Sequence, residues 1–271
     1  MTENTNKSNL IVRALKLAFR RWYVILILVL ICASPMILKA YHFRKIKLAI
    51  MQLKKDNPQF SDWGKGFLTT GNSRENLDLD KIGGLSYLYT LGDLGDLELI
   101  LKDIPVIDIS ALKGAVLKRL MLSNTKVTDI SSLRGMPLNT LHLINCQVKD
   151  ISALEGMQLT EINLKNTLVR DIGVLKGMPL EIIILQYTKV DDISPLLGMS
   201  IGNLALTDTK IKICSLKEIS CKSLVLPAAS KDADIECLRS NKVLRIINGW
   251  GIEKFWTAYD KTGEILELRK Y

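Results

Sequence analysis

Apolar and polar positions follow the same order four times between Leu117 and Gly202. Each copy reads approximately L-x-x-L/I-x-L-x-x-T/C-x-V-x-D-I-S-x-L-x-G-M, and the copies begin 21 residues apart, at Leu117, Leu138, Leu159 and Leu180. A short unit of this kind cannot bury its own apolar face and must stack on its neighbours. The pattern therefore predicts a solenoid of similar coils.

Two parts of each copy predict local structure. The L-x-L core, as in Leu120-Met121-Leu122, alternates with period two and predicts a short strand with its leucines turned inward. The D-I-S-x-L segment predicts a short helical or 3-10 turn, because Asp and Ser are good caps. Gly135 and its equivalents then end that turn.

Less regular copies flank the four regular ones. They begin near Arg74, Asp96, Ile201 and Leu224. The period and the leucine spacing are those of leucine-rich repeats. We therefore expect an α/β repeat solenoid, an arc with a concave parallel β-sheet and short helical or 3-10 turns on its convex side.

The segment Trp22 to Leu38 carries no charge and is long enough to span a bilayer as a helix. Trp22, Tyr23 and Tyr41 lie near its ends, where aromatic rings favour the membrane interface. A cleaved signal peptide is the alternative, and Pro35 beside the small residues argues against cleavage. We predict an N-terminal transmembrane helix over residues 22–38.

The expected organisation has six parts. They are a basic N-terminal segment (1–21), the transmembrane helix (22–38), a basic stalk (39–59), an N-terminal cap (60–73), the leucine-rich repeats (74–240) and a C-terminal cap (241–271).

The positive charge is confined to the N-terminal part. Residues 1–55 contain eleven Lys and Arg and one acid, a sum of +10, whereas the whole chain is +9. Residues 56–271 therefore sum to −1, which argues against a nucleic-acid partner for the repeats. Five basic residues precede the predicted transmembrane helix and six follow it closely. The distribution of charge therefore does not fix the orientation of the chain in the membrane.

The repeats resemble the internalin-type leucine-rich repeats of bacteria, and more closely those appended to membrane-anchored bacterial protein kinases. The C-terminal segment 237–249, followed by Phe255-Trp256 and Tyr259-Asp260, is similar to the capping segment of such domains. The resemblance covers about residues 74–260 and implies a binding surface outside the membrane. The chain has no Gly-rich loop, H-R-D or D-F-G motif, so a kinase activity is not implied.

Two groupings could carry chemistry. Aspartates recur at the D-I-S position (Asp108, Asp129, Asp150, Asp171, Asp192) and could be calcium ligands or turn caps. We favour capping, because basic residues flank the column and few other oxygens are available. Ser123, His142 and Glu161 could be written as a triad, but register alone places them near one another. No catalytic, cofactor or metal site is predicted, and we expect no enzyme.

Five cysteines leave several pairings open. Cys32 is expected in lipid and Cys146 in the core. Cys214, Cys221 and Cys237 lie close to one another near the C-terminal repeats, and one pair could bridge if that domain is extracytoplasmic.

The concave face carries the functional expectation. Alternation turns several apolar side chains toward solvent on this face, and such patches often bind partners. The candidate partner-binding residues are Ile100, Met121, His142, Ile144, Ile182 and Ile184. We expect a single-pass membrane protein with extracytoplasmic repeats that bind a protein or peptide. A structural, self-associating envelope component is the alternative, and a hydrolase is a remote one.

Overall fold

The computed structural model describes residues 41–42, 44–53, 55, 68–70, 97–103, 106–226 and 232–262. The chain divides into two compact units, and the larger one contains residues 46–82 and 93–271. The predicted transmembrane helix lies outside the described residues. Within the described ranges, no helix has the length and the apolar character needed to cross a bilayer.

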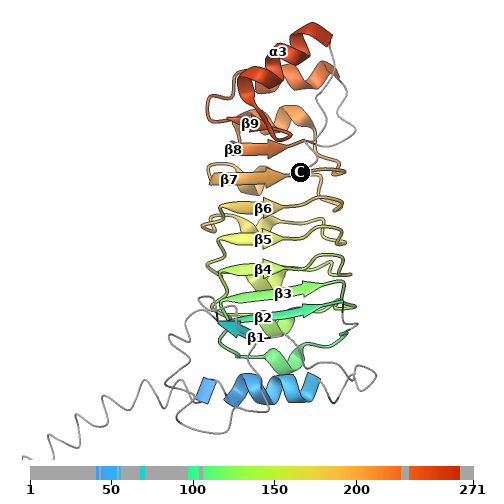
Figure 1. Cartoon of the computed structure of the whole chain (residues 1–271), viewed down its shortest axis with the longest axis vertical. Helices are drawn as coiled ribbons and strands as arrows, with labels where there is room; N and C mark the ends of the chain where they lie inside the picture. The colour runs from blue at the N-terminus through green and yellow to red at the C-terminus, as the bar shows by residue number, and fades with distance from the viewer. Residues whose placement is uncertain are drawn as a thin grey trace, which may run out of the picture. The chain divides into compact units, whose positions relative to one another are not determined.

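One sheet runs through the larger unit, with its strands in the order of the sequence (Figure 1). Strands β2 to β9 pair in parallel, whereas β1–β2 and β9–β10 are antiparallel. The strands are β1 (Leu68–Thr70), β2 (Leu97–Lys102), β3 (Arg119–Ser123), β4 (Thr140–His142), β5 (Glu161–Asn163), β6 (Ile182–Ile184), β7 (Ser200–Ala205), β8 (Ser220–Val225), β9 (Ile246–Ile247) and β10 (Trp250–Gly251).

The predicted inward leucines form continuous columns. Leu120, Leu141, Ile162 and Ile183 are register partners on successive strands. All four are fully buried, as are Leu122, Leu143, Leu164 and Leu185 two positions further on. The alternation of each L-x-L core is therefore confirmed, and the coils share one apolar interior.

A 3-10 turn follows each of the strands β2 to β8, and η2 to η6 lie at the predicted D-I-S-x-L segment. These turns are η2 (Ser110–Leu112), η3 (Ser131–Leu133), η4 (Ser152–Leu154), η5 (Gly173–Leu175), η6 (Ser194–Leu196), η7 (Ile213–Glu218) and η8 (Asp232–Leu238). At the end of η3, Gly135 takes φ = +71°, a left-handed conformation that glycine adopts without steric cost.

Thr125, Cys146, Thr167, Thr188 and Thr209 form one column, and four of these five side chains donate to backbone carbonyls. Thr167 Oγ1 donates to the Leu164 carbonyl at 2.7 Å, and Thr188 Oγ1 donates to the Leu185 carbonyl at 2.6 Å. Cys146 instead donates its thiol to the Leu122 carbonyl of the preceding coil at 2.7 Å. The threonines therefore tie the turn that leaves the strand to the strand itself, whereas Cys146 ties its turn to the preceding coil.

One column of residues takes the left-handed conformation just before the threonine column. Its φ values lie between +53° and +60°, at Asp103, Asn124, Asn145, Asn166, Tyr187 and Asp208. Asn and Asp tolerate this region better than other side chains do. Their amides also form a ladder: Asn124 donates to Asp103, Asn145 to Asn124, and Asn166 Nδ2 to Asn145 Oδ1 at 2.9 Å. Tyr187 interrupts this ladder.

The C-terminal end of the stack is closed by helix α3 (Ile252–Thr262). Phe255 of this helix is fully buried, and its neighbour Trp256 lies under the guanidinium of Arg239 at 4.2 Å from the ring centre. Arg239 also contacts Asp260 of α3 at 2.5 Å and Glu236 of η8 at 2.8 Å. The arginine therefore fastens α3 to the last 3-10 turn.

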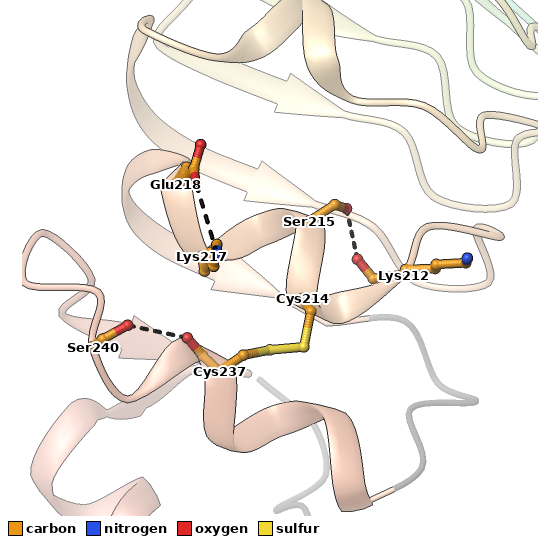
Figure 2. Close-up of a disulfide and its surroundings, with 7 residues drawn as sticks. All are labelled: Lys212, Cys214, Ser215, Lys217, Glu218, Cys237 and Ser240. Carbon is orange, nitrogen blue, oxygen red and sulfur yellow. Dashed lines mark hydrogen bonds and ion pairs between the residues drawn. A yellow bond between two sulfur atoms is a disulfide. The ribbon is translucent and has the colours of Figure 1, made fainter.

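A disulfide joins η7 to η8 (Figure 2). It links Cys214 to Cys237, whose Cα atoms are 5.5 Å apart. Cys221, the third candidate, lies in β8 with only 1% of its surface exposed. Burial also raises the pKa of the Cys221 thiol to about 11, so this side chain is a poor thiolate. The sequence left the pairing open, and the fold selects the two cysteines on adjoining turns.

The disulfide yields a first prediction. Peptide mapping without reduction should recover Cys214 joined to Cys237, while Cys146 and Cys221 should react with an alkylating reagent only after denaturation. Reduction should lower the free energy of unfolding by about 3 kcal/mol, because the bond closes a loop of moderate length. Cys214→Ser should show the same loss and no further response to reductant. A cross-linked peptide containing Cys221 would contradict the pairing.

Tyr187 yields a second prediction. A tyrosine held in the left-handed region bears a cost of about 1 kcal/mol that Asn largely avoids. Tyr187 is 48% exposed and Lys165 Nζ lies 5.8 Å from its ring centre, so little packing is lost on replacement. Tyr187→Asn should therefore raise the free energy of unfolding in urea by about 1 kcal/mol.

The control for this substitution is Tyr187→Gly. Glycine relieves the backbone cost but cannot extend the amide ladder. A gain with Asn that exceeds the gain with Gly by more than the roughly 0.5–1 kcal/mol that glycine loses in backbone entropy would assign the excess to the ladder. A loss of stability with both residues would show that the tyrosine ring contributes more than its backbone conformation costs.

Candidate functional site

The open face of the sheet, expected from the sequence to be concave, is built by the side chains that alternate with the buried leucines. In β3, for example, Leu120 and Leu122 are fully buried, whereas Arg119, Met121 and Ser123 are partly exposed. The parallel register places equivalent side chains of successive strands next to one another, at roughly the strand spacing of 4.8 Å. The face therefore consists of rows that cross the strands.

The central row of this face is mostly apolar. Its members share one register position on strands β2 to β8: Ile100, Met121, His142, Asn163, Ile184, Ala205 and Val225. Most of these side chains are half-buried, because neighbours within the row cover one another. Asn163, at 7% exposure, is the most enclosed, and its Oδ1 accepts the backbone N–H of Lys165 at 3.0 Å.

The structure thus brings together four of the six predicted partner-binding residues. Ile100, Met121, His142 and Ile184 lie in the central row. The other two flank it: Ile182 is two positions before Ile184 on β6, and Ile144 is two positions after His142.

Three members of the central row, Asn163, Ala205 and Val225, are not among the predicted partner-binding residues. Ala205 is 21 residues beyond Ile184, but Val225 is only 20 residues beyond Ala205. The late coils are less regular, and the strict period does not reach Val225. The L-x-L core Leu224-Val225-Leu226 was the signal that could have located it.

Two close pairs of ionisable side chains lie on this face. His142 Nε2 lies 2.9 Å from Glu161 Oε1, and both side chains are largely shielded from water. Arg119 Nε lies 3.7 Å from Glu98 Oε2 on the neighbouring strands β3 and β2. These pairs lower the cost of placing charge beside the apolar row.

The His142–Glu161 pair is part of the triad considered in the sequence. Ser123 lies on β3 two residues beyond Met121, the register partner of His142. A hydroxyl nucleophile needs its base within hydrogen-bond reach. Among the described residues, the bond of the His142 ring goes to Glu161 and Ser123 takes no part in it.

The aspartate column caps the 3-10 turns. In the five coils that carry this aspartate, its Oδ1 accepts the backbone N–H two residues later, at 2.7 to 2.8 Å, as the sequence led us to expect. The bond to Ser152 is the main cause of the lowered pKa of Asp150. The described part of the chain contains no group of three or more His, Cys, Asp or Glu side chains arranged to hold a metal ion.

Comparison with known proteins adds two similar structures, both from Listeria monocytogenes strain 4b F2365. Internalin C2 is 26% identical, with a TM-score of 0.48, over 55% of this chain and 69% of that one. Internalin F is 24% identical, with a TM-score of 0.47, over 55% of this chain and 46% of that one. No protein-family model and no curated protein matches the chain.

Because both TM-scores lie below 0.5, the fold assignment rests on the chain's own coils. Their 21-residue period, stacked parallel strands and 3-10 turns are those of leucine-rich repeats. The chain is a leucine-rich-repeat solenoid that resembles the bacterial internalins.

Proposed function

We propose that this chain is a single-pass membrane-anchored leucine-rich-repeat protein that binds a protein or peptide through the open face of its sheet. The observation that carries the proposal is the central row, in which apolar side chains of β2 to β8 share one register position. Packing of the solenoid does not need these side chains, because the leucine columns already fill the core. Half-exposed apolar rows of this kind suit a partner that covers them.

The chemistry of the face defines the partner. An apolar segment of the partner would lie along the central row, and its polar groups would meet the His142–Glu161 and Arg119–Glu98 pairs on strands β2 to β5. Interfaces with an apolar centre and a polar rim are typical of protein and peptide partners.

The disulfide supports a location outside the cytoplasm. Disulfides persist in oxidising compartments and are rare in the cytosol. Cys214 and Cys237 lie on the repeat side of the predicted span, so the repeats would be extracytoplasmic and the N-terminus cytoplasmic. The anchor itself is the predicted helix 22–38.

A photo-crosslinking amino acid at position 184 tests the binding face in living cells. The matched control is position 107, because Ile107 is 61% exposed and lies outside the strands of the sheet. We expect a defined foreign polypeptide to be cross-linked at position 184 and not at position 107. Equal capture at both positions would contradict a specific face, and capture of the chain itself would favour the self-associating alternative.

Ile184→Asp supplies the energetic test once that polypeptide is identified. A charge placed in the centre of a desolvated apolar row should raise Kd by on the order of tenfold or more, as substitutions at interface hot spots do. Ile107→Asp should leave Kd unchanged. Circular dichroism should be native for both variants, since Ile184 is only half-buried; unfolding by Ile184→Asp would show that this side chain belongs to the core instead.

A further inference from the structure

The helix that precedes the repeats has two apolar faces. Residues 41–42, 44–53 and 55 are helical, and we call this segment the N-terminal helix. One face is formed by Ile46, Ala49, Ile50 and Leu53, at the spacing of adjacent helical turns. Each of the four is at most 4% exposed, and they belong to the same compact unit as the repeats. This face is therefore part of the packed interior.

The second apolar face is open to solvent. Leu48 is 56% exposed, Met51 is 55% exposed and Tyr41 is 59% exposed. A helix that only capped a soluble stack would carry polar residues here. The exposed apolar side chains instead indicate a surface that is covered in the working protein.

The positive charge of the N-terminal helix indicates what covers this second apolar face. Between residues 41 and 55 the sequence contains five Lys and Arg and no acid. Arg44 and Lys55 are exposed on the same helix. A second copy of this helix would bring like charges together, whereas an anionic lipid surface accepts both the apolar and the cationic side chains.

The position of the N-terminal helix in the chain also agrees with an anionic lipid surface as its partner. Tyr41 follows the predicted span 22–38 after only two intervening residues. A helix beginning so close to a membrane-spanning segment starts at the level of the lipid headgroups, where tyrosine and snorkelling lysine side chains are favoured.

We propose that the outer face of the N-terminal helix, centred on Leu48 and Met51, is an interfacial docking surface for an anionic phospholipid bilayer. The helix then joins two environments: its inner face closes the interior of the repeat unit, and its outer face lies against headgroups and acyl chains. The proposal rests on the membrane anchor of the proposed function, and it is independent of the central row.

Spin-label depth measurements on the full chain test the proposal. A nitroxide is attached at Leu48→Cys, with Cys32→Ser as background, and the chain is placed in nanodiscs that contain phosphatidylglycerol or phosphatidylcholine alone. Ile107→Cys is the matched control, because Ile107 is also a highly exposed apolar residue. In nanodiscs that contain phosphatidylglycerol, we expect the ratio of oxygen to nickel-chelate collisions to be several times higher at position 48 than at position 107. Equal ratios would overturn the proposal.

Two further measurements separate the possible causes of failure. The double substitution Arg44→Glu with Lys55→Glu should abolish the greater depth of position 48 in phosphatidylglycerol, and no change would overturn the anionic preference. Spin–spin broadening at position 48 that disappears on dilution with unlabelled chain would identify a second copy as the occupant.

Flotation of the unaltered chain with liposomes distinguishes this inference from the anchor. A chain that floats but keeps position 48 in water would overturn the interfacial helix alone. A chain that does not float would overturn the anchor and the inference together.

Discussion

The repeat unit depends on one constraint: each coil must return its strand to hydrogen-bonding register with the strand before it. A period of 21 residues does this for the four regular copies, so that Leu120, Leu141, Ile162 and Ile183 stand side by side. Removing one such leucine would cost about 2–5 kcal/mol and would also weaken both neighbouring coils. The same register also aligns the remaining repeated positions in columns across the coils. This alignment explains the threonine bonds, the capping aspartates and the amide ladder.

A stack held together in this way leaves two ends that must be closed. The terminal partners β1 and β10 run antiparallel to their neighbours, which interrupts the parallel series at each end. At the C-terminal end, Phe255 fills the interior and Arg239 fastens α3 to η8. The Cys214–Cys237 bond lies in the same region, where the coils lose their D-I-S segment and with it the aspartate cap. Covalent closure thus occurs where the repeated interactions end.

The sequence was sufficient to predict the features that repeat. Strands, 3-10 turns and capping aspartates all follow from periodicity and local hydrogen bonding. It was insufficient where a feature depends on the neighbouring coil or breaks the period. The amide ladder was missed because its column also contains Tyr187 and two aspartates, and only the backbone φ reveals what they share. The disulfide pairing and the inclusion of Val225 in the central row likewise depend on how irregular coils stack. Of the candidate site, sequence alternation found the face, but it did not place Val225 in the central row.

Register also separates structural positions from positions that are free to vary. The inward leucines and the aspartates are fixed by packing and capping, so their repetition says nothing about function. The central row is under no such requirement, and it changes from Met121 to His142 to Asn163 between adjoining coils. A row selected for solubility alone would be polar throughout, yet Ile100 and Ile184 flank this variable centre. Apolar side chains that the fold does not need, next to polar ones that differ from coil to coil, suit the partner binding that we propose for this face.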